Sequence, residues 1–425
     1  MTPFHFLAIV AHFLFTLGVN AGNRAWEPTL KPRAESVQIT VRDVSGAHDV
    51  YGNKSQVGVM KRADIARQYT RSHASTHGHE KRWFGLPSSR EAGAPYLWPQ
   101  GNIRACFENA QHMHDGAMKT TEQILSEPLQ GARELWRQAG LDDKNGWFHF
   151  DVITNNPTYC SENNRNDRHE FLLIKYAGEG VRTMATSTGM PAELDPSPDR
   201  FPEPYTFDEL GPRMILSDDP DMGQKNVVAN FAHEMGHAWG LHHEHQNPIW
   251  WERLYSGTER SKWFFGTDSW ICENLDDYED AVAEIRSRGM AQADEEQAIA
   301  DICLKYSVAA QYKFSGFNYL PILLPFQQWD QSRQEPDWDS IMLYPSDAGG
   351  RPANGGGKAK ILFKNRNGDE ILPVVKPSQR DVAGLRKMYS APGGGTFQTL
   401  LVDARSIWNN KFKTVRRQDP DAHCT

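Results

Sequence analysis

Short apolar stretches bounded by turn residues dominate the pattern between residues 97 and 217. Stretches of about four to eight such residues are typical of strands. They predict strands at 103–107, 147–154, 171–176, 181–188 and 214–217. Asn145-Gly146 is a turn before the second of these strands, and the Pro-rich stretch 189–212 is a loop before the last.

Apolar positions three and four residues apart predict helices elsewhere in the chain. The stretch 118–139 has this spacing, but Pro128 lacks an amide hydrogen and clashes with the preceding turn. We therefore expect a break there and a second helix capped by Ser126. Further on, 279–288 and 294–306 are expected to be acidic helices.

The last part of the pattern predicts a hairpin followed by a helix. Asn367-Gly368 is a turn between expected strands at 360–365 and 371–375. Ser378 is expected to cap the helix that follows. The apolar face of that helix comprises Val382, Leu385 and Tyr389.

The most informative stretch is 226–246, in which HExxHxxGxxH is formed by His233, Glu234, His237, Gly240 and His243. Residues four apart lie on one face of a helix, so the first two histidines can share a metal ion. The glycine has no Cβ, so it can adopt a left-handed conformation and end the helix. The chain can then turn back and bring in the third histidine.

Three neutral imidazoles with an open fourth position predict a catalytic zinc site, with one Zn²⁺ per chain bound by His233, His237 and His243. Glu234 follows the first ligand directly and can act as the general base on water. The alternative is a His-rich helix end with solvated imidazoles. A non-catalytic zinc protein that acts as a binding module is a further alternative, which the intact Glu234 disfavours.

About a hundred residues later comes SIMLY, at 340–344, here called the Met turn. The long zinc motif followed by a Met-containing turn is typical of metzincins. On three further features the chain resembles astacin-type metalloendopeptidases, over residues 94–389. These features are Glu244 directly after His243, Tyr344 two residues after Met342, and YLWPQGNI at 96–103. A metzincin of another branch, such as a reprolysin, is disfavoured by the same features.

This resemblance implies an α+β, metzincin-type two-lobed zinc protease. The N-terminal lobe would hold a mixed twisted sheet plus helices, and the C-terminal lobe would be largely irregular. A helical insertion at about 256–330 looks longer than usual for the family, and we expect it to be solvated. The strand 214–217 would edge the cleft and pair with an extended polypeptide substrate.

The resemblance also implies the activity and several roles. The chain would hydrolyse internal peptide bonds of extracellular proteins. Tyr344 would be an extra zinc ligand at rest and a donor to the oxyanion during catalysis. Met342 would lie beneath the histidines, and Glu244 would pair with the mature N-terminus. Leu343 stands where many relatives have histidine, which concerns subsite detail and not the zinc chemistry.

Composition and the N-terminus indicate export. The chain is 39% hydrophobic and 24% charged with a net charge of −8, which disfavours nucleic acid as a partner. Residues 1–21 read as a signal peptide that could be cleaved after Val19-Asn20-Ala21, although its start lacks Lys and Arg; a buried N-terminal helix is the alternative. No later stretch predicts a membrane span. We expect a secreted monomer.

Residues 22–82 are expected to be a removable pro-segment. They carry a net charge of +5, against −13 for residues 83–425. The dibasic pairs Lys61-Arg62 and Lys81-Arg82 are candidate processing sites, and cleavage by a dibasic processing protease at the second would leave Trp83 as the mature N-terminus. A solvated, disordered leader is the alternative. The latency mechanism stays open, since no F-x-G-D stretch occurs here.

Residues 83–390 are expected to be the catalytic domain, and 391–425 a linker and C-terminal tail. Five cysteines in an exported chain imply disulfides with one cysteine left over. Cys272 and Cys303 are the preferred pair because they bracket the insertion. The sequence does not choose among Cys106, Cys160 and Cys424.

Overall fold

The computed structural model describes the chain from Phe84 to Ser390, with gaps. The described residues are 84–85, 97–141, 146–154, 159–160, 168–182, 184–190, 211–257, 263–323, 328–329 and 334–390. The expected signal peptide, pro-segment, dibasic pairs and C-terminal tail, with Cys424, lie outside them. Most of the Pro-rich loop lies outside them as well.

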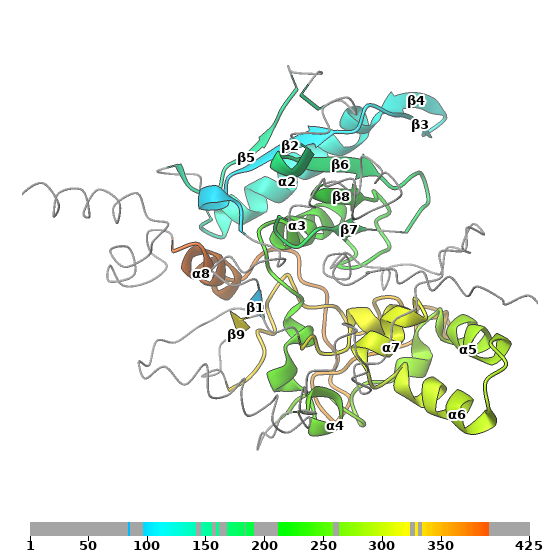
Figure 1. Cartoon of the computed structure of the whole chain (residues 1–425). Coiled ribbons are helices and arrows are strands. Elements are labelled where there is room, and N and C mark those ends of the chain that lie inside the picture. The colour runs from blue at the N-terminus through cyan, green and yellow to red at the C-terminus, as the bar shows by residue number, and fades with distance from the viewer. Residues whose placement is uncertain are drawn as a thin grey trace, which may run out of the picture.

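A five-stranded sheet lies in the upper half of the molecule, with strand order β5-β2-β6-β8-β7 (Figure 1). Neighbouring strands are parallel, except that β7 runs antiparallel to β8. The strands match the predicted ones, but two of them are much shorter than expected. Their bounds are β2 Ile103–Phe107, β5 Phe150–Val152, β6 Leu172–Tyr176, β7 Ala185–Thr186 and β8 Arg213–Leu216.

The expectation that 214–217 forms the edge of the cleft is wrong. Met214 of β8 is paired with Ile174 of β6 on one side and with Thr186 of β7 on the other. The backbone groups of β8 are therefore already used by its neighbours in the sheet. Among the described residues, the edge of the sheet on this side belongs to β7.

The two faces of the sheet bury separate clusters, because side chains alternate along a strand. In β6, Leu172 and Ile174 join the main core, while Leu173 packs with Cys106 in a small second cluster. A disulfide joins Cys106 to Cys160 on that second face. The sequence left this pairing open.

Helix α2 (Thr121–Gln138) runs unbroken through Pro128, so the expected break and the cap at Ser126 are wrong. Thr120 is the actual cap, in a capping box with Gln123. The helix packs closely against α3 (Val227–Ala238) along a buried face. Burial of that face offsets the hydrogen bond that proline cannot make. Its buried apolar residues are Ile124, Leu125, Leu129, Ala132 and Trp136.

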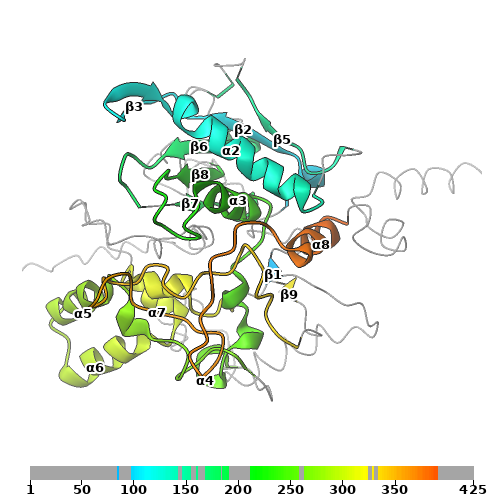
Figure 2. The same ribbon diagram turned by 180° about the vertical axis from the view of Figure 1, so that it is seen from behind.

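The lower half of the molecule is largely irregular and carries several short helices (Figures 1 and 2). The turn expected at Asn367-Gly368 is present, but the two strands expected to flank it are wrong, because a single isolated bridge pairs Phe363 with Glu370. Phe363 instead donates its N–H to Ser269 O. The helices are α4 Arg253–Ser256, α5 Tyr278–Ser287, α6 Gln292–Asp301, α7 Tyr306–Gln311 and α8 Gln379–Met388.

Two small strand pairs and several 3-10 turns complete the described elements. The strand pairs are β1 (Phe84–Gly85) with β9 (Gln328–Trp329), and β3 (Gln111–His114) with β4 (Ala117–Thr120). The 3-10 turns are η2 Pro99–Gly101, η4 Arg168–Glu170, η5 Glu244–Gln246, η6 Pro248–Trp250, η7 Cys272–Asn274 and η8 Ser315–Asn318.

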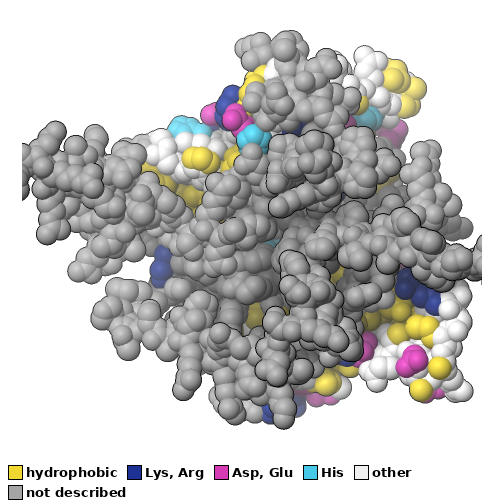
Figure 3. Space-filling model, viewed as in Figure 1, with side chains coloured by type: hydrophobic (Ala, Val, Ile, Leu, Met, Phe, Trp, Pro, Cys, Tyr) yellow, Lys and Arg dark blue, Asp and Glu magenta, His cyan; other side chains and the backbone are white. Residues whose placement is uncertain are grey.

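The expected insertion holds α5, α6 and α7, and it is anchored in the molecule. Apolar, acidic and basic side chains are intermixed on its visible surface (Figure 3). Its inner side, however, buries Ile285, Ile302 and Tyr319 in the main core. This corrects the expectation of a solvated insertion. A disulfide joins Cys272 to Cys303 and brackets α5 and α6, as preferred from the sequence.

The two disulfides fit an oxidising compartment. In the part of the chain that the structure describes, no helix is both long and apolar enough to cross a bilayer.

Candidate metal centre

Helix α3 presents His233 and His237 on one face and is fixed at both ends. The Asn226 side chain accepts a hydrogen bond from Ala229 N–H and caps the N-terminus. Just after the C-terminus, Gly240 has a φ of 103°, a conformation that glycine reaches without a Cβ clash. The chain reverses there, as predicted, and returns to place His243 beside the other two histidines.

Three indole N–H groups hold the backbone of α3 in place. Trp136 donates to Ala232 O at 2.8 Å, and Trp98 donates to Ala238 O at 2.9 Å. Trp239, which follows the helix, donates to Gly101 O at 2.9 Å. The position of the histidines is therefore set by α2 and by the opening segment that the sequence singled out.

The three imidazoles converge through their Nε2 atoms. His237 Nε2 lies 3.1 Å from His233 Nε2 and 3.0 Å from His243 Nε2. Each Nδ1 faces an oxygen at 2.7 Å: Ile341 O for His233, Leu241 O for His237 and the Gln246 side chain for His243. Because a carbonyl oxygen can only accept, each Nδ1 carries the proton and each Nε2 presents a lone pair.

Three lone pairs about 3 Å apart repel one another unless a cation lies between them. All three histidines are fully buried. Burial lowers the pKa of each imidazole, to about 4 for His237, so the neutral form that binds metal is favoured. Within the described residues, this is the one group of His, Cys, Asp and Glu with ligand atoms placed to hold a metal ion. The residues therefore fit a metal ion, and three imidazoles fit zinc.

Glu234 lies next to the first histidine on α3 and is completely buried. Burial raises the pKa of its carboxyl to about 8, and the Thr186 hydroxyl opposes this rise. A carboxyl whose pKa lies near neutrality is suited to taking up and releasing a proton. Thr186 belongs to β7, so the edge strand lies beside this carboxyl.

The Met turn is buried directly against α3. A Cβ at Gly236 would clash with Met342 Sδ, so the glycine between the two helical histidines allows the turn to approach. Met342 O accepts a hydrogen bond from Glu244 N–H at 3.0 Å. The ring of Tyr344 packs on that of His243, with the ring centres 4.4 Å apart. The turn thus contacts His233, His243 and Glu244.

Glu244 is buried below the third histidine. Its Oε1 accepts from the Trp250 indole at 3.3 Å and from Asp337 N–H at 3.1 Å. Trp83, its expected partner as the mature N-terminus, lies outside the described residues. That pairing remains a prediction.

Sequence reasoning missed three residues that shape the centre. Gly236 was visible as a glycine inside a helix, where it costs about 1 kcal/mol relative to alanine and thus signals a close approach. Asp381 of α8 was visible only as part of a capping sequence, yet its carboxylate accepts from Ser340 Oγ and Ile341 N–H in the Met turn. Gln246, three residues after the third histidine, gave no signal.

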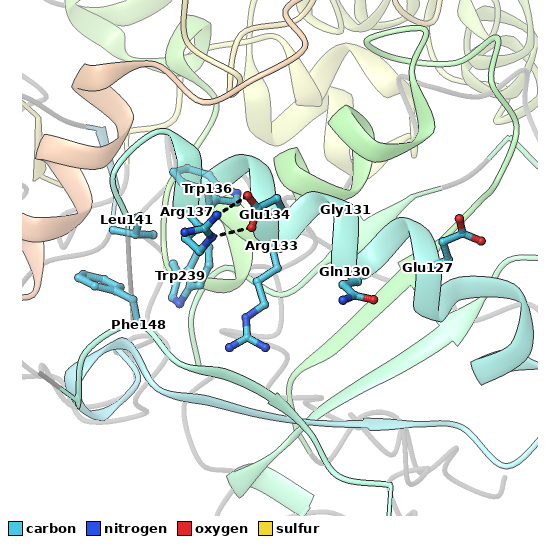
Figure 4. Close-up of a pocket in the computed structure, with 10 residues that line it drawn as sticks. All are labelled: Glu127, Gln130, Gly131, Arg133, Glu134, Trp136, Arg137, Leu141, Phe148 and Trp239. Atoms are coloured by element: carbon cyan, nitrogen blue, oxygen red, sulfur yellow. Dashed lines mark hydrogen bonds and ion pairs between the residues drawn. The ribbon is translucent and has the colours of Figure 1, made fainter. Parts of the chain in front are cut away.

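A surface depression lies elsewhere, along α2 (Figure 4). It has a volume of about 610 Å³, and α2 forms much of its wall. Arg137 and Glu134, which both line it, form a two-pronged ion pair at 2.6 Å for each contact. Trp136 and Trp239, both buried, line it, and none of the three histidines does. It is not the metal centre.

Comparisons with known proteins leave the family undetermined. No family model and no curated protein matches the chain. Among solved structures, the structure of myroilysin matches with a TM-score of 0.31 and 14% identity, covering 69% of this chain and 95% of that one. At this TM-score the likeness supports neither fold nor function. The conclusions below rest on the site itself.

Proposed function

We propose that the chain is a zinc-dependent endopeptidase of the astacin type, secreted as a zymogen. The observation that carries the proposal is the convergence of three buried imidazole lone pairs beside a buried carboxyl with a raised pKa. The packing of Tyr344 on His243 supports the astacin branch. Its substrates would be extended polypeptides that reach the site along β7.

The proposed reaction needs a general base, a Lewis acid and a hydrogen-bond donor to the oxyanion. Bound zinc, held by His233, His237 and His243, would lower the pKa of the attacking water and polarise the scissile carbonyl. Glu234 accepts the proton of the water and later delivers it to the leaving amine. Tyr344 donates a hydrogen bond to the oxygen that becomes negatively charged.

The principal rival is a zinc-binding pseudoprotease that acts as a binding module. Such a protein would share the three histidines and the fold, but it would not need a general base. A buried carboxyl beside the histidines would then have no function. Keeping such a carboxyl buried costs free energy, so its presence favours catalysis.

Casein zymography of the processed protein, with and without 1,10-phenanthroline, distinguishes the two. We expect a clear band that the chelator abolishes. Glu234→Gln should keep zinc, because Glu234 is not a ligand, and should lose at least about 100-fold in activity. A wild-type protein that holds zinc but cleaves neither casein nor a peptide library would support the pseudoprotease.

A further inference from the structure

We propose that Gln246 is a positioning residue for His243 and couples this ligand to the insertion. The inference rests on the proposed metal centre, but not on peptidase activity. Gln246 ends η5 and is 3% exposed. Its side chain lies between the third histidine and the backbone of residues 317–320, so it touches both the candidate centre and the insertion.

The orientation of this amide is set by the insertion. Gln246 Nε2 lies 2.9 Å from Phe317 O and 3.2 Å from Leu320 O. Both are carbonyl oxygens, so the nitrogen end of the amide must face them. The oxygen end then faces His243 Nδ1 at 2.7 Å. Nδ1 must therefore donate, which leaves the Nε2 lone pair of His243 toward the metal position.

His243 differs from the other two histidines in the kind of group that its Nδ1 contacts. His237 bonds to Leu241 O, four residues further along the same reversal, and His233 bonds to Ile341 O of the Met turn. Both of those partners are backbone atoms. His243 relies on a side chain, and that side chain is held in turn by the backbone of the insertion.

The backbone that holds the amide is itself well anchored. At the start of η8, Ser315 donates through its N–H and its hydroxyl to the two oxygens of buried Asp277, at 2.7 and 2.6 Å. Further on, Ile322 N–H donates to Gln246 O at 3.0 Å. His245 Nε2 lies 3.0 Å from Asn318 O, a second attachment of the His243 segment to the same turn.

These contacts assign a role to the insertion. By fixing Gln246, it selects the tautomer and ring direction of the third ligand, which raises metal affinity. Partners of this kind typically change metal affinity by about 10- to 100-fold when removed. The insertion thus affects the metal centre through Gln246 and His243, without contributing a ligand itself.

The test measures the zinc dissociation constant by competition with a chromophoric chelator. Gln246→Met keeps the length of the side chain but removes its hydrogen bonds to His243 and to the insertion. We therefore expect zinc to bind about 10- to 100-fold more weakly. Gln246→Glu keeps an oxygen opposite Nδ1, and its second oxygen, when protonated, can donate to a carbonyl. It should recover most of the loss.

Two further variants separate positioning from general destabilisation. Asp277→Ala weakens the anchor of residues 315–320 without touching Gln246, and it should weaken zinc binding in the same direction. Gln379→Met removes a comparable bond, from Gln379 Nε2 to Ala139 O at 3.0 Å, away from the ligands. It should leave the Kd unchanged while lowering the thermal midpoint of the metal-free protein.

The outcomes are distinct. A Gln246→Met variant that binds zinc within about twofold of wild type overturns the inference. If it does not fold, Gln246→Glu and Asp277→Ala carry the test, and normal zinc binding in Asp277→Ala then overturns the coupling to the insertion. A wild-type protein that binds no zinc overturns the metal centre and the proposed function together. Zinc binding without proteolysis overturns only the proposed function.

Discussion

At the scale of single residues, the centre depends on which atom of each side chain faces inward. The acceptors opposite each Nδ1 direct three lone pairs to one point. The motif spacing was sufficient to predict this group, because helix geometry places His233, Glu234 and His237 and the reversal at Gly240 brings back His243. It could not predict Gln246, whose role comes from carbonyl groups more than seventy residues away.

Tyr344→Phe tests the proposed oxyanion donor. The ring packs on His243, so phenylalanine should preserve the packing, the fold and zinc binding. Loss of a preorganised donor should lower kcat about 100- to 1000-fold with little change in KM. Steady-state kinetics on one peptide substrate measures both constants.

A neighbouring tyrosine gives the matched control for that experiment. Tyr319 is equally buried, lies 5.3 Å from Tyr344 between ring centres, and donates its hydroxyl to Ala348 O. Tyr319→Phe should cost about 1 kcal/mol of stability and spare kcat. If Tyr344→Phe retains kcat within about threefold of wild type, Tyr344 is a core aromatic and not part of the mechanism.

At the scale of elements, local sequence signals predicted the helices that local interactions stabilise. The zinc helix and the capped helix α8 are examples. The helix break predicted at Pro128 was wrong because α2 is stabilised by packing on α3, a contact between distant parts of the chain. The short edge strand β7 displaced β8 from the edge for a similar reason, since pairing order is a tertiary property.

The buried carboxyl group of Asp381 joins helix α8 to the Met turn, which makes a pH prediction possible. Burial and the nearby Asp337 carboxylate raise the pKa of Asp381, while the Ser340 hydroxyl and two backbone N–H groups oppose the rise. The folded state then holds a proton that the unfolded state has lost. Stability from this group is full below the unfolded pKa and is lost as pH rises through the folded pKa.

Urea unfolding of wild type and Asp381→Asn at pH 5 and pH 8 tests this sign. Asparagine does not titrate, and its oxygen can still accept from the N–H of Ile341. The free energy of unfolding of wild type should fall relative to that of the variant as pH rises, by on the order of 1–3 kcal/mol. An unchanged difference between the two proteins, or the opposite trend, would show that Asp381 is ionised in the fold at both values.

At the scale of the whole molecule, the two halves meet at the metal centre. The upper half supplies α3 and the edge strand, and the lower half supplies the Met turn and the insertion (Figures 1 and 2). A site made from both halves is sensitive to anything that changes their packing.

If the chain is secreted as a zymogen, as proposed, the processed protein should begin at or after Trp83. Lys81-Arg82 is the last dibasic pair before the described fold, and the resemblance assigns the buried Glu244 as the partner of the mature N-terminus. N-terminal sequencing of active, secreted material gives the cleavage site directly. An active form that still carries residues 22–82 would refute the pro-segment.

The most direct test of the account is metal reconstitution of the mature protein. Zinc is removed with a chelator and returned in steps, while bound zinc and peptide cleavage are measured on the same samples. We expect no cleavage without metal, recovery in proportion to bound zinc, and saturation at about one zinc per chain; Ca²⁺ and Mg²⁺ should restore nothing. Full cleavage by the metal-free protein, or activity that does not follow zinc occupancy, would contradict the proposed centre.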